Sequence, residues 1–167
     1  MVNDVRSVND VDWETWVPTE SAVLCFIRDK DQVMLIHKKT GLGKGKINAP
    51  GGRIEPGETP EQAAIRETQE EIGLTCTDVK EVGKLHFIFT DGYSLHGTVF
   101  VTEKYEGELI ETYEAKPFWC PIEKIPYDKM WEDDQYWLPE IIHGAYIKGY
   151  FIFDNDTMLS RRVEVLK

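Results

Sequence analysis

The stretch that decides the fold is residues 52–74, GRIEPGETPEQAAIRETQEEIGL. Local signals predict a helix over residues 60–72 within it. Thr59 and Gln62 form a capping-box pair, a proline stands at the first helical position, and Gly73 provides the C-terminal stop. The sequence therefore fixes both ends of a short helix that follows a glycine-containing turn.

This predicted helix has an acidic face and an apolar face. Successive helical residues are rotated by about 100°, so Glu67, Glu70 and Glu71 fall in one narrow arc. Ile65, Thr68 and Ile72 lie roughly opposite and can face a core. Like charges at this spacing destabilise a helix by a few tenths of a kcal/mol per pair. The arc is therefore either a solvated acidic surface or a site for a hard divalent cation such as Mg²⁺, which prefers oxygen ligands.

The spacing of residues around the arc favours the cation site. The segment matches the signature Gly-x5-Glu-x7-Arg-Glu-u-x-Glu-Glu-x-Gly-u, where u is apolar, and a chance match in the chain is on the order of one in a million. Every fixed position is present: Gly52, Glu58, Arg66, Glu67, Glu70, Glu71 and Gly73. The chain therefore resembles the Nudix hydrolase superfamily. Thr68 departs from the pattern at the first apolar position, and we expect this β-branched side chain to pack like an apolar one.

Length and composition set further limits. The 167 residues have no repeat or low-complexity run, which predicts a single domain over residues 19–167 preceded by an arm of uncertain order, residues 1–18. A formal net charge of −11 argues against binding to long nucleic acids but not against one nucleotide. No apolar run is long enough for a membrane span, and the N-terminus lacks the pattern of a signal peptide, so we expect a cytoplasmic location. Cys25, Cys76 and Cys120 have no metal-binding spacing and are expected to be buried thiols.

Hydrophobic period and turn residues predict many strands and a second helix. The combination predicts an α+β class with a mixed β-sheet sandwiched between helices, as the Nudix resemblance also implies. An Asp91-Gly92 turn is expected to join two of the strands. The predicted strands are residues 20–28, 32–39, 79–90, 93–104, 116–121, 150–153 and 157–165, and the second helix is residues 136–147.

The resemblance implies metal-assisted attack of water on a phosphoanhydride, with Mg²⁺ as the cofactor and Mn²⁺ as an alternative ion. It assigns metal ligands to Glu67, Glu70, Glu71 and the Gly51 carbonyl, and to Glu114, which is equally compatible with plain surface. Glu70 or Glu71 is the favoured residue for activating the water, with Glu67 as the next choice. Arg66 and Glu58 are expected to brace the junction of loop and helix.

Residues outside the signature sharpen the resemblance. They are GKIN at 45–48, VGKLHFIF at 82–89, IPYDKMWEDDQYWLP at 125–139 and GYFIF at 149–153. On these stretches the chain resembles, over residues 20–166, the animal-type oxidised purine nucleoside triphosphatases related to MutT, which act on 8-oxo-dGTP and 2-hydroxy-dATP. The similarity implies that the base stacks on Trp131 and bonds to Asp133, Asp134 and Asn48. One of two adjacent carboxyls in a dry pocket can keep a proton and act as a donor. The alternative is that Trp131 belongs to the core and that an aspartate caps the following helix.

Three further side chains are candidates for substrate binding. Phe87 and Phe89 share one face of a strand and can form a pocket wall, or equally belong to the core. Lys38 ends a strand beside a glycine-rich loop and can meet phosphates, or remain solvated. The partner implied is a small nucleotide; the oligomeric state stays open.

Two competing functions remain at this level. Another Nudix substrate, such as a nucleotide sugar, a dinucleoside polyphosphate or an RNA 5′ end, would use the same catalytic helix. A non-catalytic Nudix binding module would typically have a damaged signature, whereas the signature here is intact.

Overall fold

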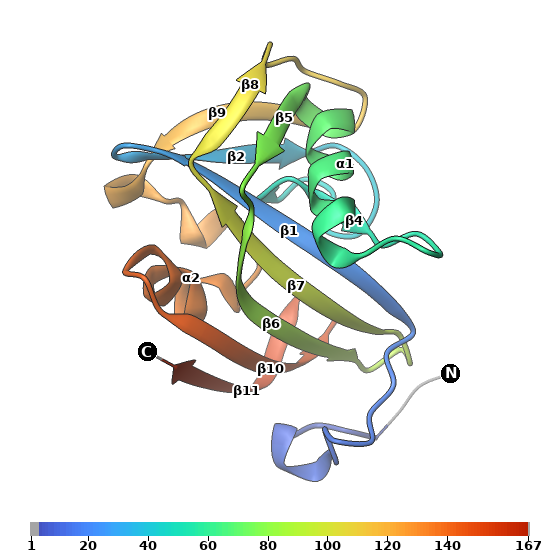
Figure 1. Cartoon of the computed structure of the whole chain (residues 1–167). Coiled ribbons are helices and arrows are strands. Elements are labelled where there is room, and N and C mark those ends of the chain that lie inside the picture. Colours follow the sequence, from blue (N-terminus) through green and yellow to red (C-terminus); the bar gives the residue numbers. More distant parts are fainter. Residues whose placement is uncertain (1–3, 167) are drawn as a thin grey trace. The chain divides into compact units, whose positions relative to one another are not determined.

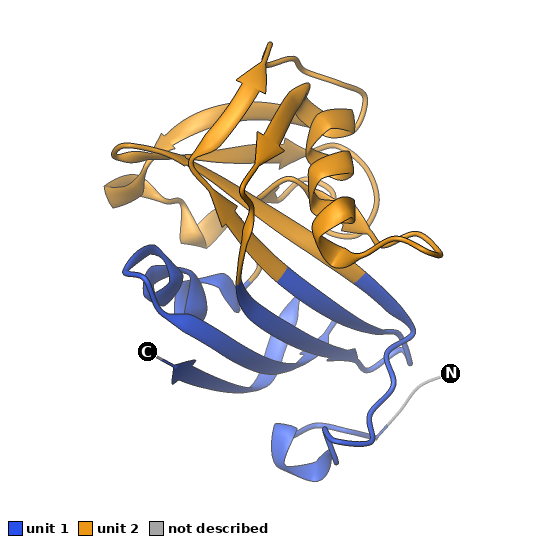
Figure 2. Ribbon diagram, in the orientation of Figure 1, with its two compact units in different colours: residues 1–21, 82–98, 132–167 blue, residues 22–81, 99–131 orange. Residues whose placement is uncertain are grey.

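The structure is a computed structural model that describes residues 4–166 (Figure 1). Residues 1–3 of the predicted arm and residue 167 of the predicted domain lie outside the described residues. The chain forms two compact units (Figure 2). Unit 1 comprises the described residues within 1–21, 82–98 and 132–167, and unit 2 comprises residues 22–81 and 99–131.

Unit 2 contains the signature helix and a set of antiparallel strands. Strand β2 pairs with β1, β3 and β9, strand β4 pairs with β1, and β5 pairs with β8. Helix α1 contacts β4, β5 and β9. The elements are β1 (Glu20–Asp29), β2 (Gln32–Lys38), β3 (Ile47–Asn48), β4 (Gly51–Arg53), α1 (Pro60–Ile72), β5 (Leu74–Thr77), β8 (Lys104–Gly107), β9 (Ala115–Pro121) and the 3-10 turns η2 (Ile122–Lys124) and η3 (Tyr127–Lys129).

Helix α1 has the predicted bounds, and its predicted end signals are all present. Thr59 Oγ1 accepts from Gln62 N at 3.1 Å, and Gln62 Oε1 accepts from Thr59 N at 3.0 Å. Gly73 ends the helix in the left-handed region, at φ 83°. A Cβ atom on Gly73 would lie 2.5 Å from the Glu108 carbonyl oxygen, so both the backbone angle and the space require glycine there.

The inner face of α1 joins a core in unit 2. Ala63, Ala64, Thr68 and Ile72 are fully buried, whereas Ile65, which was expected on this face, is only half-buried. Thr68 packs as predicted, and its hydroxyl donates to the Ala64 carbonyl at 2.8 Å within the helix. The core around this face includes Val23, Cys25, Ile27, Met34, Ile36, Leu74, Cys76, Phe100 and Ala115.

Unit 1 contains the mixed part of the sheet. Strand β10 (Tyr146–Asp154) runs parallel to β6 (Lys80–Phe89) and antiparallel to β11 (Thr157–Leu166). Helix α2 (Asp134–Ile142) contacts β10 and β11. Strands β1, β6 and β7 (Ser94–Thr102) contribute residues to both units. Parallel and antiparallel pairing on one strand confirms the predicted α+β class with a mixed sheet. The Asp91-Gly92 turn also forms, since Gly92 N donates to Phe89 O at 3.0 Å.

Several element boundaries differ from the prediction. Strand β10 begins at Tyr146 where a strand was expected from residue 150, α2 begins at Asp134 where a helix was expected from residue 136, and the short strands β3, β4 and β5 were not predicted. Two further differences have a clear physical reason. The second helix was expected over residues 136–147 but ends at Ile142, because Gly144 adopts φ 92° and Tyr146 already belongs to β10. The predicted strand 93–104 is divided, since β7 ends at Thr102 and β8 begins at Lys104 with a different partner. In both places, long-range strand pairing decides the boundary.

The three cysteines are free and buried, as expected. No helix within residues 4–166 has the length and apolar character that crossing a membrane would require.

Candidate active site

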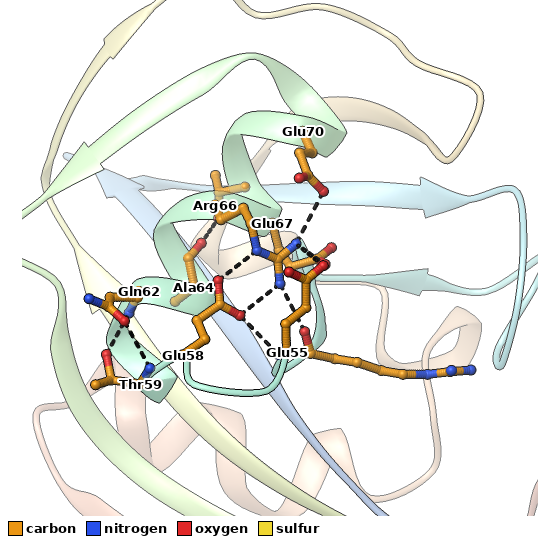
Figure 3. Close-up of polar contacts among 10 residues, drawn as sticks. Glu55, Glu58, Thr59, Gln62, Ala64, Arg66, Glu67 and Glu70 are labelled. Atoms are coloured by element: carbon orange, nitrogen blue, oxygen red, sulfur yellow. Dashed lines mark hydrogen bonds and ion pairs between the residues drawn. The ribbon is translucent and has the colours of Figure 1, made fainter.

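Arg66 lies at the centre of the acidic helix face (Figure 3). Its Nε and Nη2 donate to the two carboxylate oxygens of Glu58 at 2.7 and 2.9 Å. Nη2 also donates to the Arg53 carbonyl at 3.0 Å. This forked contact is the brace between loop and helix that the sequence predicts, and it holds the pKa of Glu58 at about 2. Two parallel bonds give such a pair a fixed geometry.

The remaining guanidinium nitrogen of Arg66 contacts two glutamates of the arc. Nη1 lies 2.7 Å from Glu67 Oε1 and 3.2 Å from Glu70 Oε2. The Glu67 side chain is 14% exposed and that of Glu70 is 49% exposed. Glu67 therefore points towards the protein interior, whereas Glu70 remains accessible to solvent.

Glu71 is the most buried member of the arc, at 3% exposure. Its Oε1 accepts from the Gly51 backbone N–H at 2.8 Å. Burial raises the pKa of Glu71 to about 8, while the Gly51 hydrogen bond acts in the opposite direction. Burial also raises the pKa of Glu67. The site thus keeps two carboxyls where their ionised forms are poorly solvated, which is the situation that a bound cation relieves.

Lys38 lies near these carboxylates. Burial lowers the pKa of Lys38, and the charges of Glu71, Glu114 and Glu67 act against that effect. Glu114 itself is exposed. The structure therefore brings together Lys38, Glu67, Glu71 and Glu114, which come from β2, α1 and the loop before β9.

That loop is fastened to both neighbouring elements. Thr112 Oγ1 donates to the Glu71 carbonyl at 2.7 Å, and Lys39 Nζ donates to the Thr112 carbonyl at 2.8 Å. Lys39 also pairs with Glu111, and its backbone N–H donates to the Glu114 carbonyl at 3.0 Å. Glu114 is thereby anchored at its backbone beside the signature helix. Neither Thr112 nor Lys39 carries a motif that would have indicated this role in the sequence.

The donor set fits a hard divalent cation in its chemistry. Carboxylate oxygens are provided by Glu67, Glu70 and Glu71, and a Cβ on Gly52 would lie only 2.3 Å from Glu67 Oε2. Glycine thus leaves the space that the Glu67 carboxylate occupies. Within residues 4–166 no three acidic, histidine or cysteine side chains already stand in a metal-binding arrangement. In this structure Glu67 and Glu70 both contact Nη1 of Arg66.

Two predicted base-contacting residues lie in unit 2. Trp131 is half-buried, and Lys46 Nζ lies 5.2 Å from the centre of its ring. Gly43 lies so close that a Cβ there would be 2.7 Å from Trp131 Nε1. Asn48 Oδ1 accepts from Ala49 N at 2.8 Å, which orients the amide. Lys46 was not among the predicted site residues, although it stands two residues before Asn48.

The two predicted aspartates lie in unit 1, at the start of α2. Asp133 is 1% exposed and Asp134 is 4% exposed. Asp133 does not cap the helix through its side chain; its Oδ2 accepts from Trp137 Nε1 at 2.8 Å. Burial raises the pKa of Asp133 to about 6, and the bond from Trp137 opposes this shift. Trp137 is a partner that the sequence did not indicate, although its i, i+4 spacing from Asp133 on a helix was available as a signal.

Phe87 and Phe89 share one face of β6, as predicted. The Phe87 ring lies 5.3 Å from Phe151 in a stacked arrangement, and the Phe89 ring lies 5.7 Å from Phe153. Phe87 is half-buried, whereas Phe89 is 7% exposed. Of the two rings, Phe87 is the one with surface available for a ligand.

Comparison with known proteins gives consistent matches. The model of the NUDIX domain family matches residues 18–141. A Danio rerio protein named oxidized purine nucleoside triphosphate hydrolase is 38% identical over 84% of this chain and 92% of its own length. The Mus musculus protein of the same name is 35% identical over 82% of this chain and 89% of its own length. The crystal structure of a MutT protein from Bacillus halodurans is 27% identical and has a TM-score of 0.79, covering 87% of this chain and 97% of that one.

The Arg66 brace has a testable pH dependence. The pKa of Glu58 is about 2 in the folded chain, below the value of about 4.3 for a free glutamate. A carboxyl with a lowered pKa stabilises the fold above its unfolded pKa, and this contribution is lost as the pH falls through the folded pKa. We therefore expect Glu58→Gln to unfold at a lower temperature than the wild type at pH 7.

The difference in unfolding temperature between the wild type and Glu58→Gln should become smaller as the pH is lowered from about 4.5 towards 2. Circular dichroism during heating measures it. Glu61→Gln, an exposed change in the first turn of α1, serves as the control and should stay close to the wild type throughout. A gap between Glu58→Gln and the wild type that does not vary with pH would show that the Glu58 charge contributes nothing.

Proposed function

The chain belongs to the NUDIX family and is a Nudix hydrolase, and from this premise we propose that it hydrolyses oxidised purine nucleoside triphosphates to the monophosphate and pyrophosphate. The observation that carries the proposal is the match, over more than four-fifths of the chain, to two vertebrate proteins that bear this activity in their names. Such an activity would remove damaged nucleotides from the precursor pool.

Nudix hydrolases generally use a divalent metal ion, and we propose Mg²⁺, with Mn²⁺ as an alternative. Glu67, Glu70 and Glu71, the Gly51 carbonyl and Glu114 would hold the ion. When bound, such an ion neutralises phosphate oxygens and lowers the pKa of a coordinated water. The burial that raises the pKa values of Glu67 and Glu71 supports this assignment. The Gly51 N–H, which donates to Glu71 Oε1, holds that carboxylate in place.

The side chains around the acidic face have separate tasks in the proposed reaction. Arg66, held by Glu58, fixes the carboxylate of Glu67 and so orients it. Glu70, whose carboxylate is exposed, would take a proton from the attacking water, with Glu71 as the other candidate. Lys38, whose lowered pKa is opposed by the nearby carboxylates, would contact a phosphate. Positioning and charge neutralisation account for most of the catalysis of phosphoryl transfer.

Base recognition is assigned to residues outside the signature. Trp131 offers an aromatic face, and stacking of a base on such a face contributes about 1–3 kcal/mol. Asn48 would bond to the base edge. Asp133 and Asp134 would do the same, and the raised pKa of Asp133 supports the idea that one carboxyl keeps its proton and donates. Phe87 would form an apolar wall against the base, and the more buried Phe89 would extend the same face of β6.

The proposed substrate is a small molecule, and its negative charge requires a cation at an acidic site. The formal net charge of −11 supports a single nucleotide over a long nucleic acid, because binding of a polymer relies on many Lys and Arg contacts. A cytoplasmic location, where nucleoside triphosphates are made, is part of the same proposal.

A substrate panel tests the function. We expect pyrophosphate release from 8-oxo-dGTP or 2-hydroxy-dATP to exceed release from the unmodified triphosphates, and to require Mg²⁺. ADP-ribose and capped RNA serve as alternative substrates, assayed for release of AMP and of the cap nucleotide as mono- or diphosphate. Preference for either of these would contradict the proposed substrate while leaving the hydrolase assignment intact, and no turnover of any compound would favour a binding module.

Substitution of Glu70 tests the reaction itself. Glu70→Gln removes the ionisable oxygen but keeps the size of the side chain, so we expect kcat to fall by about a hundredfold or more. Glu61→Gln is the matched control, since Glu61 lies on the same helix outside the acidic arc and should leave turnover unchanged. Wild-type turnover by Glu70→Gln would remove Glu70 from the mechanism.

Substitution of Trp131 and Asp133 tests base selection. Loss of a stacking face worth about 1–3 kcal/mol should raise KM about tenfold in Trp131→Ala, and Trp131→Phe should retain most of the affinity. In Asp133→Asn the amide oxygen can still accept from Trp137, so the fold is kept while the exchangeable proton is lost. We expect both Trp131→Ala and Asp133→Asn to lower the ratio of oxidised to normal turnover. An unchanged ratio in both variants would refute the proposed base site.

A further inference from the structure

The N-terminal arm, residues 4–18, packs on strands of unit 1 (blue in Figure 2). Val8, in the short turn η1 (Val8–Asp10), is 3% exposed and joins an apolar cluster with Ile88 of β6 and Ile152 of β10. Its backbone N–H donates to Ser160 Oγ of β11 at 3.0 Å, and its carbonyl accepts from Trp13 Nε1 at 3.0 Å. The arm is therefore attached to three strands at once.

An aromatic cluster continues this attachment around His86 of β6. The His86 ring lies 4.5 Å from Tyr150 in a stacked arrangement, with 12° between the planes. Trp13 lies 5.8 Å from His86 and 5.0 Å from Tyr150, and Trp16 lies 5.6 Å from His86. His86 and Tyr150 are direct neighbours in the parallel register of β6 and β10. The two tryptophans of the arm thus contact both strands at the same level.

The end of the arm is fixed as well. Thr19 N donates to Ser94 Oγ at 2.9 Å, and Ser94 N donates to Thr19 Oγ1 at 3.1 Å. A segment held by hydrogen bonds at Val8 and Thr19, with ring contacts between them, has little freedom to move away from the strands. The family match begins at residue 18, so this support is an addition to the NUDIX domain.

The arm packs on one face of β6 and β10, and the phenylalanines lie on the other. Side chains alternate between the faces of a strand, so His86 and Ile88 face the arm while Phe87 and Phe89 point away from it. The register places Phe87 beside Phe151 and Phe89 beside Phe153, and both pairs are in ring contact. The arm therefore packs on β6 from the face opposite to the candidate base-contacting side chains Phe87 and Phe89.

We propose that the arm is a positioning segment for the substrate site: by packing on His86, Ile88 and Tyr150, it fixes β6 and β10 from behind and so places Phe87 against the purine base. This inference rests on the proposed function, because it assumes that Phe87 meets the base. Protein interiors are close-packed and transmit small displacements. A shift on the order of 1 Å at a substrate-contacting group is enough to impair binding or catalysis.

Kinetics of the full-length chain test the role of the arm. Trp13→Ala removes the ring contacts, Trp13→Phe retains an aromatic ring, and Val17→Ala is the control, since Val17 is 81% exposed in the same arm. The substrate is 8-oxo-dGTP, and the assay temperature is well below the unfolding temperature. We expect KM to rise about fivefold to tenfold in Trp13→Ala, with kcat within about twofold of the wild type. This pattern results when an interaction made equally in the ground state and the transition state is lost. Trp13→Phe should restore KM, and Val17→Ala should match the wild type.

A binding experiment separates positioning from general stability. By calorimetry, Trp13→Ala should bind 8-oxo-dGMP about fivefold to tenfold more weakly and pyrophosphate as tightly as the wild type does, because only the first ligand carries a base. A lower unfolding temperature with unchanged KM and unchanged 8-oxo-dGMP affinity would overturn the proposal. If Trp13→Ala does not fold, Trp16→Ala replaces it under the same criteria. A wild type inactive on oxidised purine triphosphates would instead contradict the proposed function.

Discussion

The forked contact between Arg66 and Glu58 is the interaction on which the signature segment depends. A helix with glutamates at i, i+3 and i, i+4 repels itself, and Arg66 supplies a positive charge within the same helix. Because Glu58 and the Arg53 carbonyl occupy one side of the guanidinium, its last nitrogen is directed at Glu67 and Glu70. One residue therefore joins the loop to the helix and orients two carboxylates.

Burial acts on the charges of the site as a group. Burial raises the pKa of Glu71 and lowers the pKa of Lys38, because it disfavours the charged form of each group. The opposite charges of the two groups shift both pKa values in the other direction. Glu71 gains one more partner from the Gly51 N–H, which β4 directs towards α1. A charged group removed from water is tolerated only with partners. The glycines of β4 fit this need, because a Cβ on Gly51 or Gly52 would overlap the Val23 carbonyl or the Glu67 carboxylate.

The sequence predicted what local chemistry determines and missed what distant segments determine. The bounds of α1 follow from Thr59, Gln62 and Gly73, which lie within the helix or beside it, and the Arg66 contact follows from the same segment. The burial of Glu71 was not predicted, because it depends on β4 and on the loop before β9. The short strands β3 and β4 gain their definition only by pairing with β2 and β1. The polar composition of the arm gave no sign that its tryptophans pack on β6 and β10.

The residues proposed for the reaction and those proposed for base selection belong to different parts of this chain. All residues proposed to act on the phosphates belong to unit 2, whereas the candidates for base contact are divided between the two units, and one division falls between Trp131 and Glu132. Trp131 lies against Gly43 and Lys46 in unit 2, and Asp133, only two positions later, is held by Trp137 in unit 1. Neighbours in sequence thus take their conformations from separate cores. A substitution in either core can therefore alter one of the proposed base contacts while the signature helix keeps its geometry. In this way, proteins with the same catalytic segment can differ in the nucleotide that they select.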